Sequence, residues 1–123
     1  MNEHRSARLL VPAGVGLLLA LQIVVLYVPS APGPPAPIPH ADKLVHALVF
    51  AAPVLVAGLA RRWWWVLVAV ACLLHAPVSE AVQQVYLPGR SGDPWDLVAD
   101  LGGVAGASIG VSLWFRRPRR RRP

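Results

Sequence analysis

The sequence predicts an all-α, polytopic membrane protein, a bundle of four transmembrane helices with both termini in the cytoplasm. Of its 123 residues, 55% are hydrophobic and only 15% are charged, a composition that a water-soluble fold of this length would struggle to bury. The apolar residues fall into four runs of about 20, the length that a helix needs to cross a hydrocarbon core. The chain is short enough for a single membrane domain, residues 1–123.

The first predicted span covers residues 9–28 and follows Arg5 and Arg8. Its apolar run of about 20 residues is longer than the roughly 7 to 15 of a secretory signal peptide, so we expect a retained helix. The run ends in PSAPGPPAPIPH, where six prolines between Pro29 and Pro39 predict an extended loop.

The three other spans are predicted over residues 42–60, 63–86 and 94–115. Arg61 and Arg62 close the second span, and the third opens with WWW, which suits the aromatic belt of a membrane interface. The fourth begins with Pro94, whose missing N–H has no cost in a first helical turn. Residues 116–123 form a basic tail.

The basic residues predict the orientation. All but two of the 12, Lys43 and Arg90, lie near the termini or in the loop after the second span. Short segments rich in Lys and Arg stay in the cytoplasm, so we expect both termini there and the arginine tail at the anionic inner leaflet. The tail motif RRPRRRR lacks interleaved aromatic residues, and no nucleic-acid partner is predicted.

The polar residues within the spans gather on the predicted outer side. They open the second span, close the third, and occupy the following loop and the first turns of the fourth: Asp42, Lys43, His46, Glu80, Gln83, Arg90, Asp96 and Asp100. Residues three or four apart share a helix face, so each helix presents one polar stripe. An unpaired charge inside the membrane costs at least about 2.5 kcal/mol, and the stripes are therefore predicted to face one another as a binding pocket.

Two alternatives accompany this pocket. Gln83 is as well explained by a role in holding helices together through hydrogen bonds. The acids outnumber the bases on the outer side, which predicts that Glu80 or Asp100 holds a proton, or that His46 is protonated beside them.

A second group of residues is predicted to serve packing. Gly102, Gly106 and Gly110 recur at four-residue steps in the fourth span, with Gly103 alongside, and small residues of this kind let a neighbouring helix approach closely. His75, near the middle of the third span, is predicted to be a hydrogen-bonded packing residue.

Three motifs in order, DKLVH, SEAVQQVYLPGR and DPWDLVADLGGVAG, resemble the VanZ-like family of small bacterial integral membrane proteins. The family pattern is approximately DK-x-x-H, E-x-x-Q, an arginine, then D-x-x-x-N-x-x-G. It falls on the eight polar residues above and on Gly103, across roughly residues 42–110. Asp100 stands where the family usually has asparagine.

The resemblance implies a multi-pass protein of the bacterial cytoplasmic membrane. The namesake of the family is associated with low-level resistance to glycopeptide antibiotics, chiefly teicoplanin. Partners implied for this chain are therefore membrane lipids and a lipid-linked cell-wall precursor or a glycopeptide at the outer face.

The sequence leaves three functions open. The first is a binding or envelope-modifying protein with an outer pocket for such a precursor or glycopeptide. The second is an outer-leaflet enzyme acting on a lipid or phosphorylated lipid, with Glu80 or Asp96 as general base and His46 as its partner, while Arg90 or Lys43 holds a phosphate. The third, a proton-linked transporter, is disfavoured because the inner halves of the spans lack ionisable groups.

No cofactor and no metal site is predicted. A divalent cation held by His46 and the neighbouring carboxylates stays a weaker alternative. The sequence leaves the oligomeric state open.

Overall fold

The computed structural model describes residues 2–29, 38–60, 62–87, 89–90 and 93–117. Within these ranges all regular secondary structure is helical, in four elements: α1 (Asn2–Tyr27), α2 (Ala41–Leu59), α3 (Trp65–Tyr86) and α4 (Pro94–Arg116). Each contains a stretch long and apolar enough to cross a membrane. The prediction of an all-α chain with four such helices is confirmed.

Except at the start of α1, which begins at Asn2 instead of Leu9, the helix ends lie within two residues of the predicted limits of the spans. The largest difference within a span is at α3, which begins at Trp65 instead of Trp63 because Trp65 N donates to Arg62 O in a turn, at 3.0 Å. Most of the proline-rich loop, residues 30–37, and the end of the basic tail, residues 118–123, lie outside the described residues.

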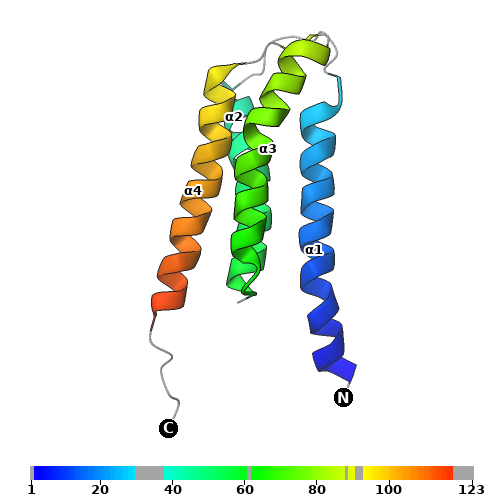
Figure 1. The fold of residues 1–123 in the computed structure, drawn as a ribbon, viewed down its shortest axis with the longest axis vertical. Helices are drawn as coiled ribbons and strands as arrows, with labels where there is room; N and C mark the ends of the chain where they lie inside the picture. The colour runs from blue at the N-terminus through cyan, green and yellow to red at the C-terminus, as the bar shows by residue number, and fades with distance from the viewer. Residues whose placement is uncertain (1, 30–37, 61, 88, 91–92, 118–123) are drawn as a thin grey trace.

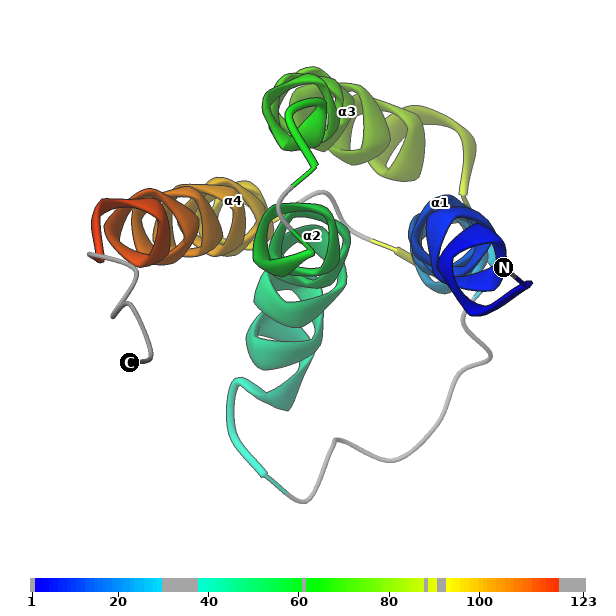
Figure 2. The same ribbon diagram turned by 90° about the horizontal axis from the view of Figure 1, so that it is seen from below.

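The four helices run up and down, and the two ends of the chain lie at the same end of the bundle (Figure 1). The opposite end, where α1 and α3 finish and α2 and α4 begin, is called the loop end below. Seen along the bundle, α2 lies between α1, α3 and α4 (Figure 2), and its most extensive packing is against α4. The loop end therefore collects the starts of α2 and α4, which carry most of the predicted site.

Two glycines bring α2 and α4 together. A Cβ atom at Gly103 would collide with the backbone of Ala47, and one at Gly58 would collide with the side chain of Val111. Without a side chain, each glycine lets the opposite helix approach closely, as small residues do in membrane bundles. This contact fixes the register of α4 against α2.

The predicted packing stripe of α4 is only partly correct for contacts within this chain. Gly103 packs as predicted, but a Cβ at Gly102, Gly106 or Gly110 would meet no atom within 4 Å. Gly102, Gly106 and Gly110 are also exposed, whereas Gly103 is partly buried. The other three glycines therefore face away from α2.

The interior of the bundle is narrow and its outside is apolar. Phe50, Val54 and Val104 are almost fully buried, whereas Leu74 and Ile109 are more than 60% exposed. Helices that are apolar on all sides belong in a hydrocarbon environment. The exposed apolar side chains agree with four membrane-spanning helices.

Candidate functional site

A pocket opens at the loop end, and all four helices contribute to its lining. Its volume is about 390 Å³, and it is lined by Val25, Asp42, Val45, His46, Gln83, Gly89, Arg90, Asp93 and Asp96. The predicted binding residues thus meet in one place, although not all reach the lining. Lys43 and Asp100 are bonded to lining side chains, whereas Glu80 is not part of the lining.

The starts of α2 and α4 place the polar side chains. His40 has the left-handed backbone φ of 60° and precedes the first turn of α2, where Asp42 and Lys43 lie. Asp93 caps α4 by accepting a hydrogen bond from Trp95 N at 3.0 Å, and Pro94 follows in the first helical position. Both helices therefore begin at the pocket, with carboxylates near their positively polarised N-terminal ends.

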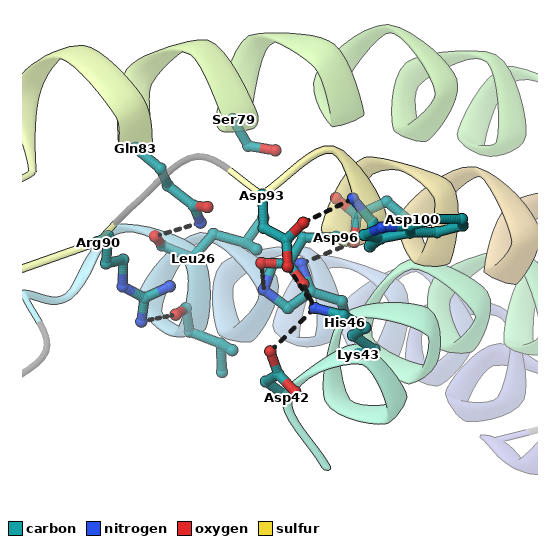
Figure 3. A network of polar contacts seen from close by, with 12 residues as sticks. Leu26, Asp42, Lys43, His46, Ser79, Gln83, Arg90, Asp93, Asp96 and Asp100 are labelled. Carbon is teal, nitrogen blue, oxygen red and sulfur yellow. Dashed lines mark hydrogen bonds and ion pairs between the residues drawn. The ribbon is translucent and has the colours of Figure 1, made fainter. Parts of the chain in front are cut away.

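Lys43 joins these two helix starts. Its ammonium donates to Asp93 Oδ2 at 2.7 Å, to Asp96 Oδ1 at 2.9 Å and to Asp42 Oδ2 at 3.2 Å (Figure 3). An ammonium group has three N–H donors, so each carboxylate takes one. The role of holding a phosphate, predicted for Lys43 or Arg90, stays a prediction.

His46 lies one turn deeper than Asp42 and is held by an acid. Its Nδ1 lies 2.9 Å from Asp100 Oδ1, and its Nε2 lies 3.9 Å from Asp96 Oδ2. Asp100 is fully buried and comes from the second turn of α4. A carboxylate bonded to one imidazole nitrogen fixes the ring and its tautomer, which leaves the other nitrogen directed toward the pocket acids.

Gln83 and Arg90 link the pocket to α1. Gln83 Nε2 donates to Leu26 O at 2.9 Å, and an Arg90 guanidinium nitrogen donates to Val25 O at 3.0 Å (Figure 3). The last carbonyls of a helix lack partners within the helix and attract positive charge. Gly89, with a φ of 81°, makes the turn that directs Arg90 to this position. Both residues line the pocket and also fasten the end of α1.

The acids deepest in the site have unpaired oxygens. Both carboxyl oxygens of Glu80 and the Oδ2 of Asp100 are buried without a hydrogen-bond partner among the described residues. A buried ionised carboxylate in this situation is expensive. The extra proton expected on Glu80, Asp100 or His46 stays a prediction.

Sequence reasoning left Asp93 out of the binding residues, although it makes the shortest contact of Lys43. The signal was present, because an aspartate directly before a proline at a helix start is typical of an N-cap followed by a first-turn proline. An N-cap carboxylate has a second oxygen that can accept from another group. In Asp93 that second oxygen binds Lys43.

A second polar cluster lies between α1 and α3. Tyr27 Oη lies 2.8 Å from His75 Nε2, and Gln22 Nε2 lies 3.3 Å from His75 Nδ1. The ring of Phe50 lies beside the same imidazole, with centroids 5.8 Å apart. His75 is hydrogen-bonded as predicted, and the sequence analysis identified neither of its two partners, Gln22 and Tyr27.

The pocket offers oriented acids, an imidazole and a guanidinium. Among the residues that the structure describes, no three His, Cys, Asp or Glu side chains form a group suited to a metal ion. The three sequence motifs DKLVH, SEAVQQVYLPGR and DPWDLVADLGGVAG contribute most of these pocket groups. In comparisons with known proteins, no family model, no curated protein and no solved structure matches this chain.

Proposed function

We propose that this chain is a multi-pass protein of the bacterial cytoplasmic membrane whose pocket faces outward and binds the polar part of a lipid-linked cell-envelope precursor or a glycopeptide. One observation supports this most strongly. A charged pocket of about 390 Å³ lies at the end of four helices that are long and apolar enough to cross a membrane. A pocket at the end of membrane-spanning helices lies near the membrane surface, where it meets the polar parts of membrane-bound ligands.

The charges of the lining favour a ligand with two kinds of polar group. Asp42, Asp93 and Asp96 supply acceptors for amine or hydroxyl donors, and Arg90 supplies a guanidinium for a phosphate or carboxylate. A lipid-linked sugar phosphate carries both kinds of group. The excess of carboxylates disfavours a purely anionic ligand.

The orientation of the pocket rests on the basic residues. Both chain ends lie opposite the loop end (Figure 1), and nearly all of the arginines lie near those ends or between the second and third spans. The positive-inside rule puts these segments in the cytoplasm. The pocket would then open to the outer leaflet, where cell-wall precursors are used and glycopeptides arrive.

A second candidate function is an outer-leaflet enzyme acting on a lipid or phosphorylated lipid. The observation in its favour is the contact of 2.9 Å between His46 Nδ1 and Asp100, which orients an imidazole that lines the pocket. An acid that orients a histidine is the arrangement used for general acid–base catalysis. Asp96 is better placed than Glu80 to act with it, because Asp96 lines the pocket and Glu80 does not.

The two functions are separated by expressing the chain in a glycopeptide-susceptible bacterium. Teicoplanin sensitivity and the lipid composition of the envelope are measured together for the wild type, Arg90→Ala and His46→Gln. Ile109→Ala, at an exposed apolar position far from the pocket residues, serves as the control.

Binding predicts a change in sensitivity that Arg90→Ala abolishes while the lipid species stay the same. Catalysis predicts a new or missing lipid that requires His46. If neither sensitivity nor lipid composition depends on the chain, both functions are wrong.

A further inference from the structure

We propose that a second cavity, on the side of the bundle between α1 and α3, binds the apolar chain of the lipid whose polar part occupies the pocket at the loop end. This cavity has a volume of about 210 Å³ and is lined by Leu19, Gln22, Ile23, Ala71, Cys72 and His75. The identification of the chain as the tail of that ligand rests on the proposed function. The cavity itself is a separate site.

The lining presents almost no free polar group to a ligand. Gln22 and His75 are its polar members, and the amide nitrogen of Gln22 lies 3.3 Å from His75 Nδ1. The other imidazole nitrogen is bonded to Tyr27, and the amide oxygen of Gln22 faces Cys72 Sγ at 4.0 Å. The polar atoms satisfy one another, so the surface left for an occupant is apolar.

The cavity opens sideways, toward the surroundings of the bundle. Ile23 and Ala71 belong to its lining and are exposed, while Gln22 and Cys72 are buried at its floor. His75 lies about 15 Å from either end of α3 at the rise of a helix, close to the middle of a span. An apolar hollow that opens at this depth faces lipid chains.

Close packing, not the hydrophobic effect, would hold a chain there. Lipid tails are as apolar as the cavity, so the transfer of a chain from the bilayer gains no hydrophobic free energy. An unfilled hollow, however, loses dispersion contacts along its walls. A chain in the cavity restores those contacts, and the shape of the hollow decides which chains fit.

The two sites are spaced for one molecule. Gln83 lines the pocket and His75 lines the cavity, and they lie two turns apart on α3, about 12 Å. On α1, Val25 lines the pocket and Gln22 lines the cavity, one turn apart. A headgroup held in the pocket raises the effective concentration of its own chain at the cavity, so two weak sites act together.

The test uses the full chain in nanodiscs that contain a lipid-linked sugar phosphate with a photoreactive diazirine in its chain. After irradiation, the labelled residues are mapped by mass spectrometry. Labelling is expected on the α1 and α3 residues of the cavity. Ala71→Phe fills the cavity from α3 and Leu19→Phe fills it from α1, and each is expected to lower this labelling at least about fivefold.

Ala105→Phe is the matched control, because Ala105 is exposed near the middle of α4 and lines neither site. It should leave cavity labelling unchanged. Labelling spread evenly over outward apolar residues such as Leu74 and Ile109, and unaffected by either filling variant, would overturn the inference. If the cavity residues are not labelled and Ala71→Phe changes the oligomer size, the inference is also overturned, and the cavity instead receives a helix from a second copy of the chain.

A second part of the experiment, which weakens headgroup binding, separates this inference from the proposed function. Excess soluble sugar phosphate and Arg90→Ala should each lower cavity labelling if one molecule occupies both sites. Cavity labelling that neither the soluble sugar phosphate nor Arg90→Ala changes supports the chain site and overturns its link to the pocket. Competition at the pocket without any cavity labelling overturns the chain site and leaves the proposed function intact.

Discussion

The Lys43 network at the loop end and the His75 cluster between α1 and α3 both join helices through polar side chains. They differ in charge and in depth. Lys43 binds three carboxylates at the helix starts, whereas His75 exchanges hydrogen bonds with the uncharged side chains of Gln22 and Tyr27 in the middle of the bundle. The ionic contacts lie at the loop end, and the imidazole of the neutral contacts belongs to the middle of α3.

This difference follows from the cost of charge in a membrane. An ionised group near the end of a span is solvated by water and headgroups, but at mid-depth it is expensive even when paired. Histidine with an amide and a phenol provides directional contacts without net charge. This division of charge supports the two proposals, a headgroup in the pocket at the loop end and an apolar chain in the cavity between α1 and α3.

The largest effect is expected from the glycine that holds the two charged helix starts together. Gly103→Leu puts a side chain against the backbone of Ala47, so α2 and α4 must separate and the Lys43 network must open. We expect a loss of about 3 kcal/mol in the free energy of unfolding, the upper end of the usual range for overpacking. Denaturant titration of the purified chain in mixed micelles measures it.

Gly106→Leu is the matched control, because a Cβ at Gly106 meets nothing within 4 Å. Its stability should equal or slightly exceed that of the wild type, since leucine has a higher helix propensity than glycine. Equal losses in the two variants would contradict the role assigned to Gly103.

A smaller effect is expected from Lys43→Met, which leaves the carboxylates without their shared cation. Asp93 and Asp96 lose contacts of 2.7 and 2.9 Å. Because the network is partly exposed, we expect a destabilisation of about 1–2 kcal/mol, less than for a fully buried ion pair. The same titration applies.

Asp42→Asn tests which of the three contacts of Lys43 contribute most to the stability of the fold. Asp42 is the most exposed partner of Lys43, with 60% of its side chain accessible, and has the longest contact at 3.2 Å. It should cost no more than about 0.5 kcal/mol. A cost as large as that of Lys43→Met would mean that the contacts to α4 are not the important ones.

Much of this fold could be predicted because each span needs an apolar run of fixed length. Hydropathy predicted the four helices, and Pro94 predicted the first residue of α4 correctly. The direction in which a small residue faces could not be predicted in the same way. Gly103 and Gly102 differ by one position in sequence, yet only Gly103 faces α2, and this depends on which helices are neighbours.

The candidate site was predictable as a gathering of residues but not as a set of contacts. The polar stripes lie at one end of the bundle because the starts of α2 and α4 meet the end of α3 there. Lys43 binds three carboxylates, and Arg90 donates to a carbonyl at the end of α1. Both contacts depend on which helices are neighbours and on how far each side chain extends. Gln22 was overlooked because a single amide in an apolar run shows no periodicity.

An effect weaker than that of Lys43→Met is expected from Tyr27→Phe in the neutral cluster. The variant removes the hydroxyl that lies 2.8 Å from His75 Nε2 and leaves the ring in place. Hydrogen bonds between membrane helices contribute about 0.6 kcal/mol on average, which is the loss we expect. Tyr86→Phe, at a tyrosine that is 74% exposed, should have no effect. A loss in Tyr27→Phe as large as in Lys43→Met would remove the distinction between the two clusters.

The smallest effect concerns the acid sensitivity of the charged network. The hydrogen bond from Lys43, and then that from Trp95 N, lowers the pKa of Asp93 below its ordinary value. A lowered pKa in the folded state means that the contribution to stability is present above the unfolded-state pKa of about 3.9 and is lost as the pH falls through the folded-state value.

The melting temperature of the wild type, measured between about pH 6 and pH 2, should therefore decrease once the pH drops below the ordinary aspartate pKa. Asp93→Asn still caps α4, because asparagine is as good an N-cap as aspartate, but it cannot form the ion pair with Lys43. Its melting temperature should depend less on pH than that of the wild type, and the two curves should converge in acid. Parallel curves across the whole range would mean that the Lys43 contact adds nothing to the N-cap, and that Lys43 acts through Asp96 and Asp42 instead.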